Sequence, residues 1–166
     1  EDLRNHIFYF IKNLDESSVR ASDFYISTIS HLTDVSQSLD YISKVSHKHV
    51  NNNHKKLKYN QLKELKELEN LFEEELFTKT KVIFENRNFN DIGKVLAVKP
   101  TLLKFVSEKI ETQVARIRTE ETSPKNSTLY FSILLETRDL LNAIMTLLEL
   151  YYRSYDADIT PASVEE

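Results

Sequence analysis

The sequence predicts an all-α protein, an up-and-down antiparallel bundle of long helices, and three observations lead to this prediction. The 166 residues include one glycine and three prolines, too few for a sheet protein that needs many tight turns. Apolar residues make up 40% of the chain and recur at helical spacing over long segments. The breaks between these segments are short, which is typical of helices that pack as antiparallel neighbours.

The first part of the chain is expected to form two helices. A short helix is predicted over about 2–13, and Asp15 is positioned to cap a second helix that runs to about residue 50. Apolar residues of the second helix fall three and four positions apart and form one stripe, which consists of Ile29, Leu32, Val35, Leu39, Ile42 and Val45. The asparagines at 51–53 are expected to end this helix.

The middle of the chain is expected to form two more helices. Asn60 is positioned to cap the first of them, which runs to about residue 87, and Pro100 starts the second. The next break is predicted at Ser123 and Pro124, because proline fits the first turn of a helix and no later turn.

The last predicted helix, about 127–155, carries apolar residues on two stripes rather than one. A helix that is apolar over so much of its circumference packs against more than one neighbour, so we expect it to lie centrally. Residues 1–155 are predicted to form a single domain, and 156–166 a flexible polar tail.

Composition excludes several classes of function. The absence of cysteine excludes disulfides, iron–sulfur clusters, thiolate zinc sites and cysteine nucleophiles. A net charge of −4 argues against nucleic acid as a partner of the whole surface. The sequence contains no signal peptide and no run of roughly 18 apolar residues that could span a membrane. It begins with Glu1 rather than methionine, so we expect a processed chain or a piece of a longer protein.

Motifs of enzymes are missing as well. The chain has no Glu-x-x-His pair for a diiron site, no His-Glu-x-x-His, no glycine-rich phosphate loop and no Gly-x-Ser-x-Gly. We therefore predict a protein that is not an enzyme and that carries no cofactor.

The stretch SHKHVNNNHKK, residues 46–56, is the candidate site, and a metal is the first ligand to consider. His47 and His49 are two residues apart, about 200° around a helix, so they point apart. His47 and His54 would lie roughly 10.5 Å apart along a continuous helix, too far to share a metal that is bonded at about 2 Å. A metal here would need ligands from a second helix.

Electrostatics suggests a different ligand for the same stretch. Between Lys44 and Lys58 there are five lysines, three histidines and no acid. Cations are favoured at the C-terminal end of a helix, and this alone accounts for a polar helix end. The alternative is contact with an anionic surface, such as phosphate or lipid headgroups. The candidate residues for an anion or membrane-proximal contact are Lys48, His49, Asn52, His54, Lys55 and Lys56.

Three segments carry a resemblance to a known family. RNHIFYFIKNLDESSVRASDFY, DVSQSLDYISKVSHKHVNNNHKKL and YFSILLETRDLLNAIMTLLELY resemble the carboxy-terminal region of bacterial sodium/phosphate cotransporters, which is itself similar to the helical regulator PhoU. The resemblance covers most of 1–155. It implies a PhoU-like regulatory domain of a sodium-dependent phosphate symporter, at the cytoplasmic face of the inner membrane, with its own transmembrane transporter domain as partner.

One family property is not expected here. PhoU proteins bind metal clusters through Glu/Asp-x-x-x-Asp pairs, whose members share a helix face. In this chain Asp40 is followed at that spacing by Lys44, and Glu136 by Leu140, so we predict no PhoU metal cluster. Two alternatives stay open, a free-standing soluble PhoU-like adaptor and a metal-binding bundle that uses His47, His49 or His54. The sequence also leaves open whether the domain forms a homodimer.

Overall fold

A computed structural model describes residues 2–13, 22–119 and 122–154. Within these ranges the chain is helical and contains no strand, which confirms the all-α prediction. The expected cap at Asp15 and the expected tail at 156–166 lie outside the described residues.

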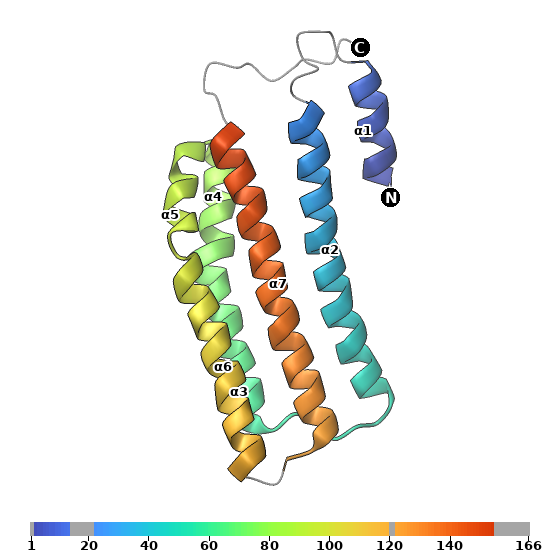
Figure 1. Ribbon diagram of the computed structural model, residues 1–166, viewed down its shortest axis with the longest axis vertical. Helices are drawn as coiled ribbons and strands as arrows, with labels where there is room; N and C mark the ends of the chain where they lie inside the picture. The colour runs from blue at the N-terminus through green and yellow to red at the C-terminus, as the bar shows by residue number, and fades with distance from the viewer. Residues whose placement is uncertain (1, 14–21, 120–121, 155–166) are drawn as a thin grey trace.

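The elements follow the predicted order, with differences at their ends. Their bounds are α1 (Asp2–Lys12), α2 (Ser22–Asn51), α3 (Tyr59–Phe72), the π-helical segment η2 (Glu73–Phe77), α4 (Thr78–Asn86), the 3-10 turn η3 (Phe89–Asp91), α5 (Ile92–Leu96), α6 (Lys99–Thr119) and α7 (Pro124–Ser154). The segments α3, η2 and α4 follow one another without a break. As Figure 1 shows, the long helices lie roughly parallel to one axis and alternate in direction.

The C-terminal end of α2 explains why the asparagines stop this helix. Asn53 adopts the left-handed conformation, with φ of 51°, which asparagine tolerates better than most residues. Its N–H donates to the carbonyl of Val50 (3.0 Å), and the N–H of His54 donates to the carbonyl of His49 (3.3 Å). These two bonds form a Schellman motif, which satisfies carbonyls that the helix leaves without partners. The predicted stop at 51–53 is confirmed.

The predicted caps of α3 and α7 have different outcomes. The structure confirms the break at Ser123 and Pro124, because the Ser123 hydroxyl accepts the N–H of Asn126 (3.4 Å) and Pro124 occupies the first turn of α7. The prediction that Asn60 caps α3 is wrong. This helix begins at Tyr59, so the cap residue is Lys58. The side chain of Gln61 reaches back over the first turn, and its Oε1 accepts the N–H of Lys58 (3.0 Å).

The hydrophobic core lies among α3, η2, α4, α5, α6 and α7. Its largest fully buried apolar side chains are Tyr130, Leu76, Ile92, Leu102, Leu134, Leu141 and Met145. Four of these seven belong to α7, which packs against α2, α5 and α6. The central position predicted for the last helix is confirmed.

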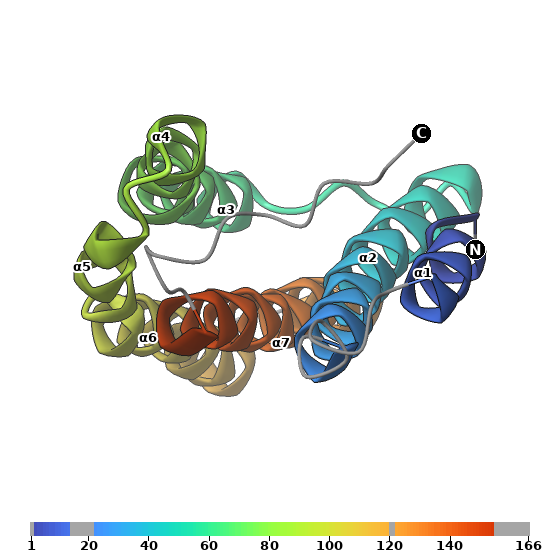
Figure 2. The same ribbon diagram turned by 90° about the horizontal axis from the view of Figure 1, so that it is seen from above.

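The apolar stripe of α2 lies outside this core. No described residue of α1 or α2 belongs to the core cluster, and α2 packs chiefly along α7. Leu32 and Leu39 of the predicted stripe are 40% and 53% exposed. Seen along the helices in Figure 2, α1 and α2 extend from one side of α7, while α3 and α4 lie on the other side. Helix α2 therefore depends on its contact with α7 for its position.

Candidate functional site: the basic end of the bundle

The candidate site lies at the end of the bundle that is lowest in Figure 1, where α2 stops and α7 starts. An open cavity of about 420 Å³ separates these two helix ends. Of the predicted residues, Lys48, His49, Asn52 and His54 line it from the side of α2 and the following turn, and α7 contributes Lys125, Thr128 and Ser132. We call the six predicted residues together with Lys125 the basic end.

The charge of this cavity has one sign. Lys48 and Lys125 face it from two different helices, and no described residue that lines it is acidic. The N-terminal end of α7 adds partial positive charge beside the cavity and the C-terminal end of α2 adds partial negative charge, so the net positive charge comes from the lysines. The hydroxyl of Ser132 can supply a neutral hydrogen-bond donor, whereas the hydroxyl of Thr128 donates to the carbonyl of Pro124 (2.9 Å). This combination suits an anion with several oxygen atoms.

Two of the histidines have a structural role. His49 is only 8% exposed, and its Nε2 lies 3.0 Å from the carbonyl oxygen of Lys55, so Nε2 carries the proton and donates it. The rings of His49 and His54 meet edge to face, with centroids 5.1 Å apart. In a Schellman motif these two positions usually make an apolar contact, and the ring pair takes its place. The pair fixes the loop that carries Lys55 and Lys56.

The surroundings of His54 disfavour its charged form. Partial burial lowers the pKa of His54, and the nearby charges of Lys125 and His49 lower it further. His54 is therefore neutral at neutral pH, and the positive charge of the basic end resides in its lysines. An anion in the cavity would oppose this effect and favour protonation of His54.

The side chains and the backbone carbonyls of Lys55 and Lys56 have different roles. Their side chains are exposed, whereas their backbone carbonyls are engaged. The carbonyl of Lys56 accepts a hydrogen bond from Nδ2 of Asn126 (2.7 Å), which ties the loop to the first turn of α7. Substitution of either side chain therefore changes the charge of the loop and leaves its anchoring bonds in place.

A buried polar network lies beneath the basic end and joins α3, α6 and α7. Nε2 of Gln61 donates to Oε1 of Gln113 (3.2 Å), and Nε2 of Gln113 donates to the hydroxyl of Ser127 (3.1 Å). The neighbouring carboxylate of Glu64 accepts hydrogen bonds from Arg116 and from the hydroxyl of Tyr130. We call the six residues Gln61, Glu64, Gln113, Arg116, Ser127 and Tyr130 the buried polar network.

Ionisation in this network follows from its partners. Burial alone would raise the pKa of Glu64, but the hydrogen bonds from Arg116 and Tyr130 outweigh burial and lower it. The hydrogen bond to Glu64 raises the pKa of Arg116, and burial together with Glu64 raises the pKa of Tyr130. The ion pair is therefore held charged, and it joins α3 and α6 to the part of α7 that follows Lys125.

The histidines do not gather into a metal site within the described residues. His47 is exposed on α2 while His49 is buried, as expected for two helical positions about 200° apart. No group of three histidine or carboxylate side chains among the described residues is placed to hold a metal ion. The geometry thus gives no support to the metal-binding alternative.

Sequence reasoning missed the contribution of α7 to the site. Lys125, Thr128 and Ser132 lie about 70 residues beyond the histidine-rich stretch, so local composition could not connect them. A usable signal was present. The break at Ser123 and Pro124 starts a helix antiparallel to α2, and this places the first turn of α7 beside the last turn of α2.

Comparison with known proteins does not assign a family to this chain. Among the described residues, no helix is both long enough and apolar enough to cross a membrane. No protein-family model matches the sequence, and neither a curated protein nor a solved structure is significantly similar to it.

Proposed function

We propose that this chain is a regulatory domain without catalytic activity, located at the cytoplasmic face of the inner membrane, that modulates a sodium-dependent phosphate symporter through its basic end. The observation that carries the proposal is the position of Lys48 and Lys125 on two helices around an open cavity, which has no acidic residue among its described lining. The resemblance to the carboxy-terminal region of sodium/phosphate cotransporters supplies the transporter as partner. The anionic surface would be that of the membrane beside the transporter.

The expected strength of this contact fits a domain that is held close to the membrane by its partner. A lysine near an anionic bilayer contributes about 1 kcal/mol, so Lys48, Lys55, Lys56 and Lys125 together contribute about 4 kcal/mol. The net charge of −4 opposes attraction of the whole domain, so only the basic end favours the contact. An interaction of this size orients a tethered domain and can be released by a competing signal.

Phosphate uptake in cells tests the proposal. The variant Lys48→Glu/Lys55→Glu/Lys56→Glu reverses three exposed charges of the basic end and leaves its backbone hydrogen bonds intact. We expect this variant, expressed with its transporter, to lose the normal adjustment of uptake to external phosphate.

A second triple variant controls for the change in net charge. Lys81→Glu/Lys94→Glu/Lys104→Glu makes the same change in net charge on exposed lysines of α4, α5 and α6, outside the basic end. It also breaks three exposed ion pairs, each of which contributes less than about 1 kcal/mol. We expect this control to regulate uptake as the wild type does. Equal regulation of phosphate uptake in the two triple variants would show that the basic end has no part in the mechanism.

A further inference from the structure

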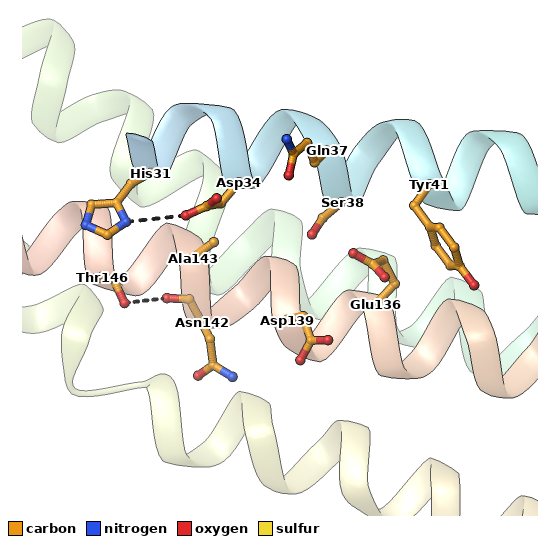
Figure 3. Close-up of a pocket in the computed structure, with 10 residues that line it drawn as sticks. All are labelled: His31, Asp34, Gln37, Ser38, Tyr41, Glu136, Asp139, Asn142, Ala143 and Thr146. Atoms are coloured by element: carbon orange, nitrogen blue, oxygen red, sulfur yellow. Dashed lines mark hydrogen bonds and ion pairs between the residues drawn. The ribbon is translucent and has the colours of Figure 1, made fainter. Parts of the chain in front are cut away.

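A second open cavity, of about 540 Å³, lies between α2 and α7 and differs from the basic end in charge. Figure 3 shows its ten lining residues, and all of them except Ala143 carry a polar side-chain group. Asp34 lies on α2, and Glu136 and Asp139 lie on α7. We call this cavity the acidic groove. Its lining holds these three carboxylates and no lysine or arginine among the described residues, so its formal charge is −3.

One mostly buried side chain in the acidic groove, Ser38, has a hydroxyl without a partner in the described chain. Ser38 is 7% exposed and makes no hydrogen bond with any described residue. In Figure 3 its hydroxyl points from α2 toward Glu136 and Asp139. The oxygen of this hydroxyl is not among the fully buried unpaired atoms, so water can reach it in the open groove and a ligand there could replace that water.

The carboxylates of the groove are also incompletely compensated. Asp34 lies 3.7 Å from His31, and Asp139 lies 3.7 Å from Arg138, distances longer than a hydrogen bond. Glu136 is half-buried and has no ion-pair partner among the described residues. The groove therefore presents negative charge and a free hydroxyl to a cation that is not part of the chain.

The shape of the groove decides which cation fits. It extends along α2 from His31 to Tyr41, ten residues or about 15 Å of helix. No three carboxylate or histidine side chains of the described chain are close enough together to coordinate one metal ion. Charges spread along an elongated groove match ammonium groups spread along an extended chain, and the ring of Tyr41 can receive an ammonium group at one end.

We propose that the acidic groove binds a linear aliphatic polyamine, with its ammonium groups on Glu136, Asp139 and Asp34 and with Ser38 as an additional acceptor. The ligand would bridge α2 and α7. Because α2 lies outside the core, such a bridge would hold α2 in place and raise the melting temperature. This inference does not depend on the proposed function of the basic end.

Calorimetric titration of the full chain with spermidine at low ionic strength tests the proposal. We expect saturable binding that weakens as salt is added, because the attraction is between exposed charges. In Glu136→Gln/Asp139→Asn we expect affinity to fall about tenfold, the product of two losses of about threefold each. The control Glu74→Gln/Glu111→Gln removes two exposed carboxylates outside the groove and should bind as the wild type does.

Ser38→Ala separates a binding role from a packing role. We expect this variant to bind spermidine severalfold more weakly while its melting temperature without ligand stays about the same, because the hydroxyl makes no hydrogen bond within the described chain. Four results would overturn the proposal: no saturable binding, equal affinity in the two double variants, tighter binding of Mg²⁺ than of spermidine, or binding of an arginine-rich peptide without binding of spermidine.

Discussion

Replacement of Glu64 by alanine tests whether the buried polar network fixes the end of the bundle. The side chains of Glu64 and Arg116 are 12% and 15% exposed, and Tyr130 is fully buried. Removal of the carboxylate leaves the Arg116 guanidinium without its ion pair and the Tyr130 hydroxyl without its acceptor. Loss of one member of a buried pair costs 3–5 kcal/mol, and an unsatisfied buried hydroxyl costs about 1 kcal/mol or more.

We expect the free energy of unfolding to fall by about 4 kcal/mol, the lower end of the summed range, because some water reaches the ion pair. For a domain of this size that corresponds to a fall in melting temperature of roughly 8–16 °C. Equilibrium unfolding in urea, followed by circular dichroism, measures the loss directly. Glu67→Ala is the matched control, because Glu67 also pairs from α3 to α6, with Lys109 at 2.9 Å, but is 43% exposed. The control should lose less than about 1 kcal/mol. Equal losses in the two variants would refute the reasoning.

Three further predictions concern the ends and the core of the bundle. Leu134→Ala should lower the free energy of unfolding in urea by about 2–5 kcal/mol, because Leu134 is fully buried on α7. Leu39→Ala on the exposed stripe of α2 should lower it by less than about 1 kcal/mol. Similar losses in the two variants would place α2 in the core. Asn53→Val should lower stability by about 1–2 kcal/mol through strain in the left-handed conformation, whereas Asn53→Gly should be neutral or stabilising. Thermal melting measures both variants. A higher melting temperature for the valine variant than for the glycine variant would exclude the left-handed conformation. The pKa of His54 is lower in the folded state than in the unfolded chain, so the folded state binds fewer protons and the free energy of unfolding should fall as the pH drops through 6.5. His54→Gln should flatten this part of the plot of stability against pH. An unchanged plot would contradict the environment described for His54.

The sequence was most informative where a local rule acts alone. Asparagines at 51–53 ended α2 because one of them adopts the left-handed conformation, and Pro124 started α7 because proline fits a first turn. The cap of α3 was misjudged because two signals competed. Asn60 is a favoured cap residue, but Gln61 reaches back to Lys58, so the actual cap is Lys58, two residues before the predicted one.

Features that depend on contacts between distant segments could not be predicted in the same way. The stripe of α2 has the same spacing as a core stripe, and only the packing shows that Leu39 is half exposed. Polar positions 34 and 38 of α2 and 136 and 139 of α7 each lie on one helix face, but the acidic groove forms only when the two faces meet. Lys125 joins the basic end for the same reason.

The central claim is that the basic end binds an anionic surface, and sedimentation with lipid vesicles at low ionic strength tests it most directly. We predict that the wild-type chain and the Lys81→Glu/Lys94→Glu/Lys104→Glu control sediment with phosphatidylglycerol vesicles and stay in solution with phosphatidylcholine vesicles. The Lys48→Glu/Lys55→Glu/Lys56→Glu variant should stay in solution with both. Equal sedimentation of the two triple variants, or equal binding of the wild type to charged and neutral vesicles, would contradict the account.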